Sequence, residues 1–228
     1  MLGEKPMFRD RSEAGQLLAK KLASYADRND TIVLGLPRGG VPVAFEIASE
    51  LHLPLDILPV RKLGVPGQPE LAMGAIGPGG IRIVDHVMIR QLGVTEDEVT
   101  DTIRDEEEEL KRREQIFRNY RPPVVIKGLN VIVVDDGIAT GSSMLAAIQV
   151  LLSQQPARII VVVPVAPPHT RREIEAVAQE FVCLHVSEYF PAVGSFYRDF
   201  SQVDDQEVCR LLTDSAQSLA KRGTERPC

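Results

Sequence analysis

The sequence has few cysteines, no long apolar run and no excess of positive charge, and each of these shortages excludes a class of protein. The cysteines at positions 183, 209 and 228 are too few and too scattered for a disulfide framework or a zinc site. No window approaches the roughly 18 apolar residues of a membrane span, and the N-terminus lacks the apolar core of a signal peptide. A net charge of -6 argues against a general nucleic-acid-binding protein. We therefore expect a cytoplasmic protein with neither a membrane nor a nucleic acid as its partner.

The chain is long enough for one substantial core, and its 228 residues do not demand two. Its 44% of hydrophobic and 25% of charged residues are typical of a soluble globular protein. Apolar runs that are typical of strands alternate with segments of helical periodicity. This alternation predicts an α/β fold with a parallel sheet and right-handed crossovers. The predicted strands are 31–36, 55–60, 131–134, 158–165 and 181–186. The predicted helices are 10–27, 42–51, 142–153, 170–180 and 204–220, followed by a frayed tail at 221–228.

The stretch from Val131 to Ser143, VIVVDDGIATGSS, contains the most informative pattern in the chain. Four branched apolar residues precede Asp135 and Asp136, and a glycine-containing turn then opens a helix, as at the ligand crevice of a parallel sheet. Adjacent carboxylates can accept hydrogen bonds from the 2- and 3-hydroxyls of a ribose 5-phosphate, and a hydroxyl-bearing helix N-terminus can hold its phosphate. The turn residues that would enclose the phosphate are Gly137, Ala139, Thr140, Gly141, Ser142 and Ser143. The alternative is an N-capped helix after a buried strand, with both aspartates as turn residues.

The same stretch resembles the phosphoribosyl pyrophosphate (PRPP) signature of the type I phosphoribosyltransferases. In that signature a hydrophobic strand precedes two acidic residues, a short spacer, Thr-Gly and a small hydroxylated residue. The resemblance covers residues 31–200, apart from a helical insertion at about 85–125. It implies a Rossmann-like core with a mostly parallel sheet flanked by helices, and a small hood at about 187–203. We expect one phosphoribosyltransferase domain over residues 1–228.

A second unit of strand, turn and helix carries Arg38, Gly39 and Gly40 in its turn. Two glycines let a backbone approach a dianion closely, and a guanidinium can bind two of its oxygens. This turn resembles the pyrophosphate loop of the same family, which implies that the three residues bind PRPP. Arg61 and Lys62 follow the predicted strand 55–60, where two cations would favour a polyphosphate. The alternative for this pair is a solvated strand end.

Residues 63–80 are rich in glycine and proline and too long for a tight turn, which predicts a functional loop that covers the site. Residues 59–77 are similar to the part of adenine phosphoribosyltransferases in which an Arg-Lys pair precedes a mobile loop. The catalytic glutamate of that loop has no clear counterpart here, because residues 77–80 occupy its neighbourhood and Glu70 lies earlier. We expect residues 81–84 to return as a hairpin strand against residues 71–76.

The longest predicted helix begins at Thr95, whose spacing to Glu98 matches a capping box. Acidic residues at 106–109 followed by basic residues at 111–113 suit the helix dipole and four-residue ion pairing. We interpret this helix as a solvated insertion between core strands. A cover over the site and a dimer contact are the alternatives.

Five of the aromatic residues, out of four tyrosines and seven phenylalanines, fall within residues 189–200. Aromatic rings on a loop beyond the last strand form a stacking surface for a planar base. The segment resembles the hood of purine phosphoribosyltransferases, which implies that Phe190 and Tyr197 bind the acceptor base, with plain packing as the alternative. His169 fits a helix start better than a catalytic base, and Cys183 fits inert core packing.

The resemblance implies transfer of the 5-phosphoribosyl group of PRPP to a nitrogen nucleophile of a small acceptor, with release of pyrophosphate. The acceptor would be a nucleobase, as in purine salvage and nucleotide metabolism. Asp135 and Asp136 would orient the ribose, and Arg61 and Lys62 would stabilise the departing diphosphate, so these four form the predicted catalytic set. Mg²⁺ would bridge the diphosphate and the ribose hydroxyls, with Asp135 and Asp136 as weak ligands through water or the substrate. The resemblance also implies a homodimer.

Ala139 departs from one branch of the family. Hypoxanthine-type members carry an aspartate there as general base to the purine, so the sequence disfavours hypoxanthine or guanine as acceptor. The adenine and orotate types tolerate a small residue at this position. Two hypotheses therefore remain, a PRPP-dependent enzyme and a regulatory protein that senses PRPP or a nucleotide without turnover.

Overall fold

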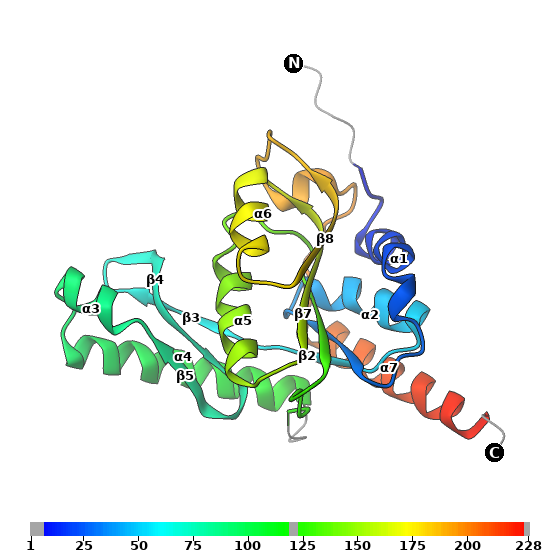
Figure 1. The fold of residues 1–228 in the computed structure, drawn as a ribbon, viewed down its shortest axis with the longest axis horizontal. Helices are drawn as coiled ribbons and strands as arrows, with labels where there is room; N and C mark the ends of the chain where they lie inside the picture. The colour runs from blue at the N-terminus through cyan, green and yellow to red at the C-terminus, as the bar shows by residue number, and fades with distance from the viewer. Residues whose placement is uncertain (1–6, 119–122, 226–228) are drawn as a thin grey trace.

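Five parallel strands form the central sheet of the computed structural model, which describes residues 7–118 and 123–225 (Figure 1). Their order across the sheet is β2-β1-β6-β7-β8, so β6 lies in the middle. The strands are β1 (Thr31–Gly35), β2 (Leu55–Ile57), β6 (Asn130–Val134), β7 (Arg158–Ala166) and β8 (Glu180–Val186). Apolar runs such as NVIVV are expected for strands that helices cover on both faces. The predicted α/β fold with a parallel sheet is confirmed.

Alternate residues of β6 point to two separate cores. Val131 and Val133 pack on the face covered by α5 (Ser142–Ser153), and α6 (Pro168–Glu175) lies on the same side. Ile132 and Val134 pack with α1 (Arg11–Lys21) and α2 (Gly40–Leu51) on the other face. This alternation follows from the two-residue repeat of a strand. The sheet is thus the middle layer of three (Figure 1).

A second sheet, with three antiparallel strands, extends to one side of the first (Figure 1). It consists of β3 (Arg61–Val65), β4 (Gln68–Gly77) and β5 (Ile81–Val84), and the short 3-10 helix η2 (Pro78–Gly80) joins the last two. Together with α3 (His86–Leu92) and α4 (Glu96–Arg118) it forms a unit that we call the arm, residues 61–118. The hairpin expected between residues 71–76 and 81–84 is confirmed, with Ala75 opposite Ile83 and Ile76 opposite Arg82.

Two predictions about the arm are wrong. The glycine- and proline-rich residues 63–80 form a β-hairpin, not a covering loop. The strand predicted at 55–60 ends at Ile57, so Arg61 and Lys62 begin β3 and do not follow a strand of the parallel sheet.

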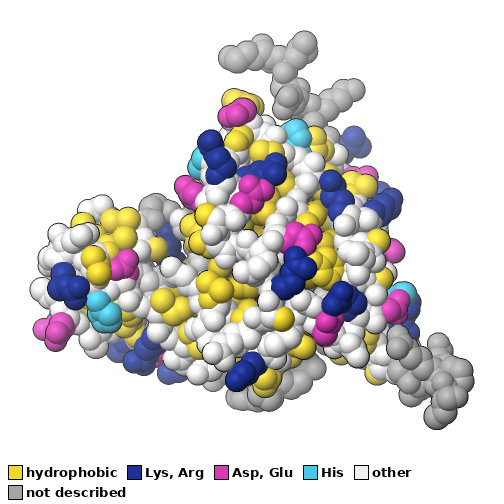
Figure 2. All heavy atoms as spheres, viewed as in Figure 1, with side chains coloured by type: hydrophobic (Ala, Val, Ile, Leu, Met, Phe, Trp, Pro, Cys, Tyr) yellow, Lys and Arg dark blue, Asp and Glu magenta, His cyan; other side chains and the backbone are white. Residues whose placement is uncertain are grey.

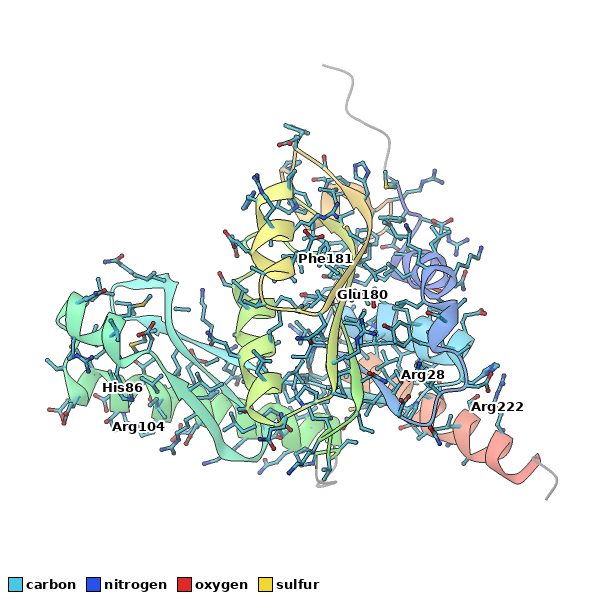
Figure 3. The ribbon with its side chains drawn as sticks, in the orientation of Figure 1. Arg28, His86, Arg104, Glu180, Phe181 and Arg222 are labelled. Carbon is cyan, nitrogen blue, oxygen red and sulfur yellow. The ribbon has the colours of Figure 1, made fainter. Side chains whose placement is uncertain are left out.

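Helix α4 is anchored on one face, although its other face is exposed. The predicted capping box is present, because Glu98 accepts a hydrogen bond from the Thr95 amide at 2.9 Å and Thr95 Oγ1 accepts one from the Glu98 amide at 3.3 Å. Leu110 and Phe117 are only 5% and 4% exposed, and Leu110 packs under the second sheet. Figure 3 labels Arg104 on the arm, where its side chain is 61% exposed. The interpretation of this helix as a merely solvated insertion is therefore wrong for its inner face.

Three helical elements remain to be described, two short 3-10 helices and the C-terminal helix α7. The 3-10 helices η1 (Ala23–Tyr25) and η3 (Val193–Phe196) lie after α1 and in the hood segment. Helix α7 (Asp205–Glu225) packs with α2 and α4, and it extends five residues beyond the predicted end at 220. Residues 221–225 of the predicted frayed tail are therefore helical, and its residues 226–228 lie outside the described ranges. None of the described helices has the length and apolarity needed to cross a membrane.

Charge is dispersed over the surface that Figure 2 presents. Basic and acidic side chains lie interspersed on this face, with apolar side chains between them (Figure 2). Among the described residues in this view, neither sign of charge gathers into one large patch.

Candidate functional site: the cleft between the parallel sheet and the arm

The loops after β1 and β6 leave the sheet side by side. Gly35 pairs with Val134 in the parallel register, and the Leu36 amide donates to the Val134 carbonyl at 2.9 Å. A Cβ on Gly39 would lie 2.1 Å from Asp136 Oδ2, and a Cβ on Gly40 would lie 2.5 Å from the Val134 carbonyl oxygen. Both glycines are thus required for the contact between the two loops, apart from any anion that they bind.

The paired aspartates each have one oxygen held by the protein. Asp135 Oδ1 accepts the Asp136 amide at 2.9 Å, and Asp136 Oδ2 accepts Arg11 Nε at 2.8 Å. The two carboxyl groups also interact with each other, and within residues 7–118 and 123–225 no guanidinium, hydroxyl or backbone amide donates to Asp135 Oδ2 or Asp136 Oδ1. Burial raises the pKa of Asp135 well above its ordinary value, and the charge of Asp136 adds to this effect. Burial also raises the pKa of Asp136, but the Arg11 guanidinium opposes that shift.

The turn after the aspartates presents hydroxyl groups at the start of α5. Thr140 and Ser143 are exposed, and Thr140 Oγ1 lies 3.2 Å from Ser142 Oγ. Gly141 has a φ of 78°, a conformation that strains residues with a side chain, and α5 begins directly after it. The amides of the first turn have no partner within the helix, so this end of α5 can bind an anion.

Thr170 supports this turn from beneath, a role that no sequence pattern indicated. Its side chain is fully buried, and its Oγ1 donates to the Ala139 carbonyl at 2.8 Å. A Cβ on Gly141 would lie 2.8 Å from the Thr170 methyl carbon. The threonine lies in a helix 31 residues away in sequence, so no local pattern could reveal the contact.

A cleft of about 660 Å³ lies between the parallel sheet and the arm. On the side of the parallel sheet are Asp135 and Ser143, which with Asp136 and the turn 137–142 we call the carboxylate end. On the side of the arm are Arg61 and Lys62, which with Arg113 we call the cationic end. The structure thus brings together the aspartate motif and the predicted basic pair, although their elements differ from those expected.

Helix α4 forms one wall of the cleft through Thr102, Glu106 and Arg113. Glu106 forms an ion pair with Arg61, and Arg113 Nε lies 2.7 Å from Glu109 Oε1. Of the interpretations considered for this helix, a cover over the site agrees with its position. Because Glu106 and Arg113 lie in the inserted segment, the family signatures did not indicate them.

Arg38 lies outside this cleft lining. Its side chain is 40% exposed, and its Nη1 lies 3.8 Å from Asp205 Oδ1 at the start of α7. The peptide bond between Pro37 and Arg38 is cis. Pro37 does line the cleft, so the turn reaches the site through its backbone while the guanidinium points to α7. Ser142 lines a neighbouring cavity between α5 and the second sheet.

The two predicted base-binding residues pack in the hood. Tyr197 is 4% exposed, and its ring centroid lies 5.4 Å from Phe8 and 5.0 Å from Phe200. The Tyr197 hydroxyl donates to the Asp136 carbonyl at 2.6 Å, and burial raises the tyrosine pKa far above its ordinary value. Tyr197 therefore has no exposed ring face for a nucleobase and instead supports the aspartate loop. Phe190 is half-buried, with its ring centroid 5.0 Å from that of Phe196.

Arg11 is the functional candidate that the sequence patterns missed. It is the first residue of α1, whose N-cap is Asp10, and the helix pattern only predicts that its charged residues are solvated. In the structure its side chain is 11% exposed and contacts Asp136, 125 residues away. A long-range contact of this kind leaves no local signal in a single sequence.

The aspartates fit a magnesium ion only as minor ligands. The described part of the chain contains no cluster of three or more His, Cys, Asp or Glu side chains that could hold a metal. Two carboxylates with open oxygens fit a cation that takes most of its ligands from substrate oxygens and water, which is usual for Mg²⁺. The weak metal-binding role of Asp135 and Asp136 stays a prediction.

Comparison with known proteins places the chain in a family. Residues 11–200 match the family described as "Phosphoribosyl transferase domain". A Mycobacterium tuberculosis (strain H37Rv) protein with the name "Putative phosphoribosyl transferase Rv0571c" is 42% identical over 217 residues, which are 95% of this chain and 49% of that protein. The chain thus spans about half the length of this curated relative. The crystal structure of TT1426 from Thermus thermophilus is similar at a TM-score of 0.83 and 42% identity, covering 91% of this chain and 98% of that one. The chain therefore belongs to the phosphoribosyl transferase domain family.

Proposed function

We propose that this protein is a phosphoribosyltransferase that transfers the 5-phosphoribosyl group of PRPP to a nitrogen nucleophile, a nucleobase, and releases pyrophosphate. The observation that carries the proposal is the distribution of charge along one cleft. Carboxylates and a hydroxyl-bearing helix start line the cleft from the parallel sheet, and cations line it from the arm. PRPP has two ribose hydroxyls and a 5-phosphate at one side and a diphosphate at the other, so it matches both ends.

In this assignment the carboxylate end binds the sugar. The oxygens left open on Asp135 and Asp136 accept hydrogen bonds from the ribose 2- and 3-hydroxyls. The 5-phosphate binds the amides at the start of α5 and the hydroxyls of Thr140, Ser142 and Ser143. The 36–40 turn, with Arg38, Gly39 and Gly40, contributes backbone groups beside the diphosphate.

The reaction breaks the bond between C1 of the ribose and the diphosphate oxygen, and the electron pair leaves with pyrophosphate. The acceptor nitrogen forms the new bond to C1 and then loses its proton to water. Charge grows on the leaving group as the bond lengthens, so the cationic end stabilises the transition state more than the ground state. Magnesium, when bound with PRPP, supplies further charge neutralisation at the diphosphate. The negative aspartates face the positive charge that develops on the sugar.

A second candidate, PRPP binding without turnover, is favoured by two observations. Ala139 provides no carboxylate as general base to a purine, and no other described residue of the 135–143 turn beyond the paired aspartates carries one. Arg61 is already paired with Glu106, so a diphosphate must displace a carboxylate to reach it. A sensing protein needs the binding site but not the base.

The test is release of pyrophosphate from PRPP and Mg²⁺ with a panel of nucleobases and other nitrogen nucleophiles. We expect at least one acceptor to support release, and Asp136→Asn to abolish it. Thermal shift with PRPP alone reports binding whether or not turnover follows, because a ligand that binds only the folded state raises the melting temperature. A shift without release for every nucleophile would support the sensing protein. Neither a shift nor release would refute both.

A further inference from the structure

Arg11 connects three parts of the molecule around the carboxylate end. Its Nε donates to Asp136 Oδ2 at 2.8 Å, and its Nη1 donates to the Ser201 carbonyl at 2.8 Å. Its guanidinium carbon lies 3.9 Å from the centroid of the Phe200 ring. One side chain from the first turn of α1 thus contacts the sugar-binding loop and the last part of the hood segment.

The position of Arg11 determines which oxygen of Asp136 remains available. Oδ2 lies against Gly39, where a Cβ would be 2.1 Å away, and it accepts the guanidinium. Apart from the interaction of this carboxylate with the adjacent Asp135 carboxyl group, no guanidinium, hydroxyl or backbone amide of the described ranges donates to Oδ1. On the other side of the loop, the Tyr197 hydroxyl holds the Asp136 carbonyl at 2.6 Å. The carboxylate is therefore held at its backbone and at one oxygen, with the other oxygen left for a ligand.

The contacts of Arg11 are better explained by orientation of Asp136 than by a gain in stability. The pair is almost entirely buried, with Arg11 11% and Asp136 14% exposed, and a buried ion pair is often no more stabilising than apolar residues of similar volume. Its geometry instead suits orientation, because a guanidinium with two fixed contacts and a stacked ring has little freedom to rotate. The neighbouring Asp135 carboxylate has no such partner and relies on the Asp136 amide.

We infer that Arg11 is a positioning residue, which fixes the Asp136 carboxylate so that its open oxygen faces a ribose hydroxyl of the bound sugar phosphate. The inference rests on the proposed function, because it names the substrate group that the fixed oxygen binds. It assigns Arg11 no contact with the diphosphate. Loss of Arg11 should therefore affect ligands that contain ribose and spare those that do not.

The experiment compares three probes by isothermal titration calorimetry, namely ribose 5-phosphate, PRPP with Mg²⁺, and inorganic pyrophosphate with Mg²⁺. The variants are Arg11→Met, which keeps the length but removes both hydrogen bonds, and Arg11→Lys, which keeps the charge. Arg9→Met is the matched control, because the Arg9 side chain is 62% exposed and forms an ion pair with the neighbouring Asp10.

In Arg11→Met we expect the affinity for ribose 5-phosphate and PRPP to fall by about tenfold or more, as for loss of a charged hydrogen bond. The affinity for pyrophosphate should stay within about twofold, and Arg11→Lys should recover part of the loss. Equal losses for all three probes would mean that Arg11 only maintains the fold, and no loss for ribose 5-phosphate would mean that it does not orient Asp136. Either result overturns the inference while the proposed function stands. If the wild type binds neither sugar phosphate, the proposed function fails, and the inference fails with it.

Discussion

The two ends of the cleft differ in how the chain builds them. The carboxylate end comes mostly from one continuous stretch, residues 135–143, at the junction of a buried strand and a helix. The cationic end combines the start of β3 with side chains from α4, and its paired residues Arg61 and Glu106 are 45 residues apart. A site made from one strand end inherits its geometry from the sheet register, whereas a site between a hairpin and a helix depends on their packing. We therefore expect the positions of the side chains at the carboxylate end to change less on mutation of surrounding residues than those at the cationic end.

The largest effect is expected from Asp136→Asn at the carboxylate end. We expect kcat/KM for PRPP to fall by about a hundredfold or more, because the amide loses the charge that binds a hydroxyl and leaves Arg11 buried without its partner. Asp214→Asn is the control, since that carboxylate is 46% exposed on α7 and pairs with Arg210. Pyrophosphate release in steady state is the measurement. Equal activity of the two variants would mean that the Asp136 carboxylate does not bind PRPP during the reaction.

A second prediction concerns the packing that supports the cationic end. Leu110→Ala should lower the free energy of unfolding by about 3 kcal/mol, because Leu110 is 5% exposed beneath the second sheet and its truncation leaves a cavity. Val87→Ala on the same arm, where the side chain is 55% exposed, should change it by less than about 0.5 kcal/mol. Urea denaturation measures both. If α4 were only a solvated insertion, the two variants would be equally stable.

Arg61→Gln should separate the two ends functionally. We expect pyrophosphate affinity to fall about tenfold, since one charged contact is lost, while ribose 5-phosphate binding remains unchanged. This is the reverse of the pattern expected for Arg11→Met. Arg82→Gln is the control, because Arg82 is 56% exposed and pairs with Glu107 outside the cleft lining. Calorimetric titration of both ligands is the measurement, and a loss for both ligands in Arg61→Gln would mean that the ends are not separate.

The smallest effect is expected from Glu106→Gln. Glu106 is paired with Arg61 in the cleft, so removing its charge should tighten pyrophosphate binding by about two- to fivefold, as for a partly exposed ion pair. Glu108→Gln on the exposed face of the same helix should have no effect in the same titration. Weaker binding in Glu106→Gln would contradict competition between this carboxylate and the diphosphate.

The sequence predicted the carboxylate end well because its signal is local. A buried strand, two carboxylates and a hydroxyl-bearing helix start are consecutive, and helix 142–153 has the predicted bounds. The arm was less predictable, because a glycine-rich segment can form either a loop or closely approaching strands. Residues 63–80 were predicted as a covering loop that includes the strand 71–76, but a Cβ on Gly74 would lie 2.2 Å from the Ile83 carbonyl oxygen, so this glycine permits close approach of two strands.

Contacts between distant segments were beyond the reach of sequence patterns. Arg11 and Thr170 reach the aspartate loop from helices that lie 125 and 31 residues from their partners. The roles of Tyr197 and Arg38 differed for the same reason, since a hood aromatic and a turn cation found partners inside the protein, the Asp136 carbonyl and Asp205. A single sequence shows which residues carry the chemistry, but not which of them are already paired.

The most direct test of the account is a crystal structure of the protein with PRPP and Mg²⁺. We predict the ribose hydroxyls at Asp135 and Asp136, the 5-phosphate at the start of α5, and the diphosphate toward Arg61. A sugar phosphate bound in the reverse orientation, or outside the cleft between the sheet and the arm, would contradict the account.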